Sequence, residues 1–158
     1  MSDMSSLQSR LQAISQSSDD RSTRLEGFVA AVAEGFEART CTLHRTDDDA
    51  QLLHLEAATG LPDHVRQLVA KIPFGKGMAG ICWERREPVT VCNLQTDDSG
   101  VVRPGAKDTK VAGALVVPVF QGDAIRATLG IGKAEDHDYT DDEIAHLRSC
   151  GEILLDLL

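Results

Sequence analysis

The sequence lacks any apolar run that approaches the ~20 residues needed to span a bilayer, and its first residues lack the basic and apolar regions of a secretory signal. It is also poor in basic residues, because 16 Lys and Arg stand against 25 Asp and Glu and give a formal net charge of -9. Nucleic acids and anionic membrane surfaces both select basic patches. We therefore expect a cytoplasmic protein that has neither of them as a partner.

Cysteine is scarce as well, and its spacing argues against two common uses. The four cysteines, Cys41, Cys82, Cys92 and Cys150, include no Cys-x-x-Cys pair. The sequence therefore indicates neither a zinc site nor a disulfide framework. Isolated cysteines are commonly buried as small hydrophobic side chains. We expect reduced thiols and no metal ligands, and the sequence does not identify a cofactor.

The apolar residues of the chain suffice for one domain. Its 158 residues are 42% hydrophobic and 26% charged, which is typical of a globular protein with its own core. We predict an N-terminal helical arm or tail over residues 1–20 and one domain over residues 21–158. Either a frayed amphipathic tail or a short dimerisation arm explains the heptad spacing of apolar residues in the first segment. These residues are Met4, Leu7, Leu11 and Ile14.

Periodicity, caps and turn residues predict alternating helices and strands along the rest of the chain. Helices are expected at residues 23–36, 62–71, 78–86 and 140–158, and strands at residues 40–45, 52–57, 89–94, 111–120 and 125–131. Four of the strands pair as two antiparallel hairpins, and the second hairpin is apolar enough to lie in the middle of a sheet. Residues 95–110 show no sustained period, and a loop of this length inside a domain is usually functional or mobile.

Three short motifs occur in the same structural contexts as in one known family. Ile-Pro-Phe-Gly-Lys-Gly-Met-Ala-Gly at residues 72–80 leads into a helix, Val-Pro-Val at residues 117–119 lies in a strand, and Tyr-Thr-Asp-Asp-Glu at residues 139–143 begins the last helix. With these motifs, residues 25–158 resemble the GAF family. The resemblance implies an α+β fold: a central antiparallel sheet of about five to six strands, with terminal helices on one face and a ligand pocket on the other.

The resemblance also implies a function and a place for it. We expect a non-catalytic sensory domain that binds a small molecule, forms a homodimer through its terminal helices and passes a signal to a partner protein. The pocket walls would come from the helix that begins at Met78, the strand end at residues 92–93 and the loop that follows. The residues predicted to bind the ligand are Phe74, Ala79, Trp83, Cys92, Asn93, Lys107, Asp108 and Lys110.

The first of these motifs is also expected in the free methionine-R-sulfoxide reductases, which are single-domain GAF enzymes of about this length. Their chemistry uses one thiolate to attack the sulfoxide and a second thiol to resolve the sulfenic acid. The two family cysteines fall here on Ala79 and Lys107. The acidic residues that suit the substrate's ammonium group fall on Ala114, Gly130 and Gly132. The comparison favours a protein without this activity.

Two alternatives concern the chemistry of the pocket. Cys82 and Cys92 lie near its expected walls, and they could serve a thiol-dependent enzyme as a redox pair or hold a metal. Arg103, Lys107 and Lys110 form a basic cluster in an acidic chain. The cluster either attracts an anionic ligand, with help from backbone donors near the glycines of the first motif, or belongs to a solvated loop.

Four further residues have two interpretations each. Trp83 either forms part of the pocket wall or packs in the core. His44 either projects into the pocket or lies on the solvent-exposed face of the sheet. Gly130 and Gly132 share one face of a strand, where they either leave room for a ligand or allow close packing of a neighbouring element.

Overall fold

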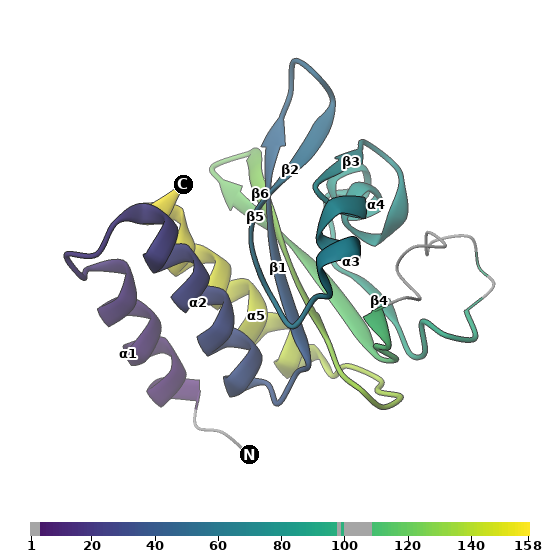
Figure 1. The fold of residues 1–158 in the computed structure, drawn as a ribbon, viewed down its shortest axis with the longest axis horizontal. Coiled ribbons are helices and arrows are strands. Elements are labelled where there is room, and N and C mark those ends of the chain that lie inside the picture. The colour runs from purple at the N-terminus through teal and green to yellow at the C-terminus, as the bar shows by residue number, and fades with distance from the viewer. Residues whose placement is uncertain (1–3, 98, 100–108) are drawn as a thin grey trace.

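The computed structural model describes residues 4–158 apart from residues 98 and 100–108. Its centre is a six-stranded sheet in which every pair of neighbouring strands is antiparallel, in the order β3-β2-β1-β6-β5-β4. Helices α1, α2 and α5 lie on one face of this sheet, and α3 and α4 lie on the other (Figure 1). This arrangement confirms the expected α+β fold.

The helices and strands have the following bounds. The helices are α1 (Met4–Ser15), α2 (Arg21–Gly35), α3 (Asp63–Leu68), α4 (Gly77–Arg85) and α5 (Asp141–Leu154), and a short 3-10 turn, η2 (Leu155–Leu157), follows α5. The strands are β1 (Thr40–Asp47), β2 (Leu52–Thr59), β3 (Lys71–Pro73), β4 (Val89–Val91), β5 (Ala114–Gln121) and β6 (Ala124–Gly132). Strand β3 was not predicted, because three residues are too few to show a strand period.

The main core lies between the sheet and the terminal helices. Successive side chains of a strand point to opposite faces, so β1 directs Cys41 and Leu43 towards the helices and the intervening residues to the other side. Phe28 of α2 and Leu147 of α5 are fully buried against this face. The middle strands β6 and β5 are buried over most of their length, as the continuous apolarity of that hairpin predicts.

Helix α1 packs on its own chain. Leu7 and Leu11 have exposed fractions of 5% and 0% and belong to the main core, where α1 contacts α2 and α5. Gly35 allows this approach, because a Cβ atom there would lie 2.7 Å from a methyl carbon of Leu7. The helix is therefore part of the same packed layer, and the proposed division of the chain at residue 20 stays a prediction.

Side-chain caps fix where α2 and α5 begin. Thr140 accepts a hydrogen bond from the Glu143 N–H, and the Glu143 carboxylate accepts one from the Thr140 N–H, so the predicted capping box of α5 is present. Helix α2 begins earlier than the sequence pattern indicated. Its cap is Asp20, whose carboxylate accepts a hydrogen bond of 2.8 Å from the Thr23 N–H.

Candidate ligand-binding site

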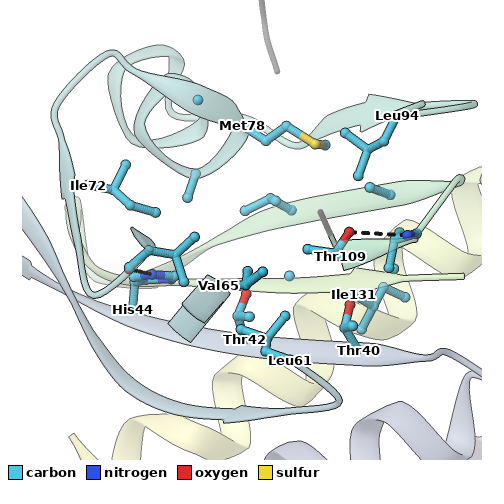
Figure 2. Close-up of a pocket in the computed structure, with 18 of the residues that line it drawn as sticks. Thr40, Thr42, His44, Leu61, Val65, Ile72, Met78, Leu94, Thr109 and Ile131 are labelled. Carbon is cyan, nitrogen blue, oxygen red and sulfur yellow. Dashed lines mark hydrogen bonds between the residues drawn. The ribbon is translucent and has the colours of Figure 1, made fainter. Parts of the chain in front are cut away.

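A cavity of about 230 Å³ lies between the sheet and the α3–β3–α4 segment, on the face opposite the terminal helices. The sheet forms its floor, and α3, β3 and the first turn of α4 form its walls (Figure 2). The described residues that line it are Thr40, Thr42, His44, Leu61, Val65, Leu68, Val69, Ile72, Gly77, Met78, Ala79, Leu94, Thr109, Val111, Ala114, Val116, Gly130, Ile131 and Gly132. Most of these side chains are apolar.

The alternation of strand β1 places a row of polar side chains on the floor. Thr40, Thr42 and His44 all face the cavity, since the residues between them face the core. Their neighbours across the sheet are small, because Thr40 pairs with Gly132 and Thr42 pairs with Gly130. No side chain of β6 therefore covers these hydroxyls.

The two glycines of β6 are surrounded closely. A Cβ atom on Gly132 would lie 2.5 Å from a methyl carbon of Val111 and 2.8 Å from the Thr40 hydroxyl oxygen. On Gly130 it would lie 3.2 Å from both Thr42 and Val116. Close packing of neighbouring side chains therefore requires glycine at Gly132, and both positions border the cavity.

His44 is buried and neutral. Its exposed fraction is 3%, so the interpretation that it lies on the solvent-exposed face of the sheet is wrong. Burial lowers the pKa of His44 to about 4, although a hydrogen bond to the Val69 carbonyl opposes that shift. The Nε2···O distance of this bond is 2.8 Å. Because a carbonyl only accepts, Nε2 carries the proton and Nδ1 is left as an acceptor.

The threonine hydroxyls on the floor have unused hydrogen-bonding capacity. Thr40 is 6% exposed, and neither its hydroxyl nor that of Thr42 makes a hydrogen bond to any residue that the structure describes. Thr109 differs, because its Oγ1 accepts a hydrogen bond of 3.1 Å from the Val111 N–H. Buried polar groups in proteins almost always have a partner. The hydroxyls of Thr40 and Thr42 are thus available to a molecule in the cavity.

The first turn of α4 supplies further donors. Gly77, Met78 and Ala79 line the cavity, and the first N–H groups of a helix have no acceptor within the helix. The N-cap residue Lys76 provides no side-chain cap, and within the described part of the chain no other acceptor pairs with these three N–H groups. The helix N-terminus also carries roughly half a positive charge. An acceptor atom of a ligand would satisfy these donors.

Of the residues predicted to bind a ligand, Ala79 lines the cavity. Phe74 and Trp83 pack against each other edge to face, with ring centroids 4.9 Å apart. Trp83 is buried with Cys82 in a second core cluster behind the wall, which agrees with its packing interpretation. Phe74 lies at the surface, with an exposed fraction of 37%.

Of the other predicted residues, Cys92, Asn93 and Lys110 are not part of the described lining of the cavity. Cys92 is exposed, and the Asn93 amide donates a hydrogen bond of 2.6 Å to the Asp136 carboxylate. Lys110 is exposed and has a left-handed backbone with φ of 62°, between two residues that do line the cavity. Lys107 and Asp108 lie outside the described residues, and so does the basic residue at position 103.

Both thiols near the walls resist ionisation. Burial raises the pKa of Cys82 to about 12, and its Sγ contacts the Val116 carbonyl at 3.8 Å. A hydrogen bond to the Asp138 carboxylate raises the pKa of Cys92 above its ordinary value. Neither cysteine is among the described lining of the cavity. The part of the chain that the structure describes also holds no group of three His, Cys, Asp or Glu side chains that fits a metal ion.

Several lining residues were not predicted from the sequence. Thr40 and Thr42 were readable in principle, because they alternate with apolar residues in a predicted strand. Leu61, Val65 and Leu68 were not, because their place depends on how α3 folds back over the sheet. Leu68 is 51% exposed at the edge of the cavity, and a single sequence gives no signal for such a position.

Comparison with known families identifies the class of protein. The family model described as GAF domain matches residues 18–155. The chain therefore belongs to the GAF domain family, as its three motifs and its fold indicate. A search of curated protein sequences gives no significant match. Among the described helices, none is long and apolar enough to cross a membrane.

Solved structures support the same fold. The GAF domain of a phosphoenolpyruvate-protein phosphotransferase from Coxiella burnetii superposes with a TM-score of 0.82 at 21% identity, over 98% of this chain and 92% of that one. The free methionine-R-sulfoxide reductase of Neisseria meningitidis, in complex with its substrate, gives 0.81 at 18% identity over 98% and 87%. The reduced form of fRMsr of Staphylococcus aureus gives 0.79 at 19% identity over 100% and 97%. A GAF domain of a phosphotransferase and a free methionine-R-sulfoxide reductase thus share this architecture.

Proposed function

We propose that this GAF domain is a non-catalytic sensor that binds a small molecule in the cavity above β1 and passes the signal to a partner protein. The observation that carries the proposal is the combination of an apolar cavity with unpaired hydroxyls on its floor. Cavities that bind small molecules are mostly apolar, with a few polar groups that fix orientation. This one has that composition.

The alternative is a thiol-dependent enzyme related to the free methionine-R-sulfoxide reductases, to which the chain is similar in fold. The positions matched to that family's acidic residues, namely Ala114, Gly130 and Gly132, and the position of one of its cysteines, Ala79, all border the cavity here. A nucleophilic cysteine needs a lowered pKa, whereas those of Cys82 and Cys92 are raised. These observations favour the sensor.

Replacement of the two cysteines distinguishes the sensor from the enzyme. We expect Cys82→Ser with Cys92→Ser to leave ligand binding unchanged, because neither thiol is part of the described cavity lining. The measurements are the dissociation constant of a bound small molecule and reduction of free methionine-R-sulfoxide, each compared with the unaltered protein. Reductase activity that disappears in the double variant would establish the enzyme instead.

Native mass spectrometry of the protein purified from its own host tests the binding function directly. A retained small molecule that is lost on denaturation, and whose binding is reduced by a variant of the cavity floor such as Thr42→Val, is the expected result. Protein that carries no such molecule, and that also binds none from a host metabolite extract, would contradict the proposal.

The setting of the sensor is part of the same proposal. We place it in the cytoplasm, as a homodimer formed through the terminal helices, with a separate signalling protein as its output. Leu7 and Leu11 of α1 are buried within the protomer, so a dimer would use other residues of these helices. Sedimentation velocity measures the dimer. The predicted preference for an anion rests on Lys110, which does not line the cavity, and on two residues outside the described chain, and it stays a prediction.

A further inference from the structure

The polar groups of the cavity define what its occupant must offer. On the floor, the Thr40 and Thr42 hydroxyls can each donate one hydrogen bond and accept others, and neither has a partner in the described chain. Across from them, Gly77, Met78 and Ala79 present N–H donors that no described residue accepts. An occupant without hydrogen-bonding groups would displace water from these donors without replacing its hydrogen bonds, which costs free energy at each donor.

The walls determine whether the occupant can carry a charge. In the described part of the lining, Val65, Ile72 and Leu94 contribute apolar atoms to the walls, and the titratable His44 is held in its neutral form. Burial of an ionised group without a full counter-charge is very costly, whereas a neutral amide or carbonyl needs only its hydrogen bonds. The half-charge at the N-terminus of α4 suits a carbonyl oxygen and offsets only part of a full negative charge.

Size sets a further limit on the occupant. Pockets that hold drug-sized molecules occupy roughly 300–1,000 Å³, and this cavity occupies about 230 Å³. A single ring or a short branched chain with one polar group fits such a space.

We propose that the cavity takes a small, uncharged molecule with an apolar body and one amide or carbonyl group, which bonds to the floor hydroxyls of Thr40 and Thr42 or to the first-turn N–H groups of α4. This inference rests on the proposed binding function and adds the chemical class of the ligand. It differs from the anion that the basic loop residues predict.

Matched pairs of probes that differ only in charge test the inference. The pairs are benzamide with benzoate and cyclohexanecarboxamide with cyclohexanecarboxylate, each titrated into the full chain near neutral pH. Amide-proton NMR shifts on β1 and α4 report binding at this cavity. We expect each carboxamide to bind at least about tenfold more tightly than its carboxylate.

A matched pair of variants tests the role of the hydroxyls. Thr42→Val keeps the shape of the side chain and removes its hydroxyl, and we expect it to weaken carboxamide binding about fivefold. Thr90→Val makes the same change at an exposed position of β4, away from the cavity, and should leave binding unchanged. Because the Thr42 hydroxyl makes no hydrogen bond to a residue that the structure describes, we expect both variants to fold, which circular dichroism checks.

Three results would overturn the inference, and they separate it from the binding function. A carboxylate that binds as tightly as its carboxamide would show that the site accepts charge. So would an anionic molecule retained in the native mass spectrum, and in both cases the sensor proposal survives. If no carboxamide shifts the β1 signals at millimolar concentration, the inference fails, and the sensor proposal fails with it only if the purified protein also retains nothing.

Discussion

His44 is the single titratable side chain in the described lining of the cavity, and it couples the stability of the fold to pH. In the folded chain its pKa is about 4, below the ordinary value of 6.5. Between these values the unfolded chain binds more protons than the folded one, so the free energy of unfolding falls as the pH falls. The stability that depends on a neutral His44 is fully present above about pH 6.5 and is lost as the pH falls towards 4.

We expect the loss over this range to reach roughly 3 kcal/mol, as an upper value for one group. The His44→Gln variant should flatten the dependence, because glutamine can still donate to the Val69 carbonyl but has no proton to gain. Urea unfolding at pH 7 and pH 5, between which about 2 kcal/mol of this loss is expected, measures both proteins. His146, whose pKa burial also lowers, accounts for a residual slope. An unchanged slope in the variant would show that His44 is not the group responsible.

At the scale of the secondary-structure element, the same substitution in two helical glycines should change stability in opposite directions. A Cβ on Gly80 of α4 would lie 2.4 Å from the Pro73 carbonyl oxygen of β3, so Gly80→Ala must push α4 away from the sheet. On Gly27 of α2 the nearest atom would be 3.9 Å away, which is ordinary contact. We expect Gly80→Ala to lower the free energy of unfolding by about 1–3 kcal/mol and Gly27→Ala to raise it by about 0.5–1 kcal/mol.

Thermal and urea unfolding of the two glycine variants measure this contrast. The Gly80→Ala variant should also weaken ligand binding, because the same displacement moves Ala79 and the cavity wall. Equal stability changes in both variants would mean that the approach of α4 to β3 does not depend on Gly80.

At this scale the sequence predicted the elements better than the site. The apolar hairpin β5–β6 and the capped helix α5 follow from local pattern, so their type and place were predictable. Strand β3 was missed because its evidence is its pairing with β2, which only the folded chain provides. The site residues of α3 were missed for the same reason. The positions around Ala79 were found through family motifs, which mark the turn into α4.

At the scale of the whole molecule, the open question is whether residues 1–20 are part of the domain, and the test is whether the chain folds without its first helix. We expect removal of residues 1–20 to lower the free energy of unfolding by several kcal/mol, because Leu7 and Leu11 leave the main core and Asp20 no longer caps α2. The single variant Leu11→Ala should cost about 2–5 kcal/mol. Gln12→Ala, at an exposed position of α1, is the matched control and should change little. A truncated chain as stable as the full one would establish residues 1–20 as a dispensable arm.

The edge-to-face pair of Phe74 and Trp83 makes the protein its own optical probe. The chain contains one tryptophan, and it lies one helical turn from Ala79 on the helix whose first turn borders the cavity. Its emission spectrum therefore comes from a single indole, packed behind the wall that a bound molecule would touch. Occupancy could be followed by fluorescence with no label attached, and a Phe74→Leu variant would change the signal without changing the floor of the cavity.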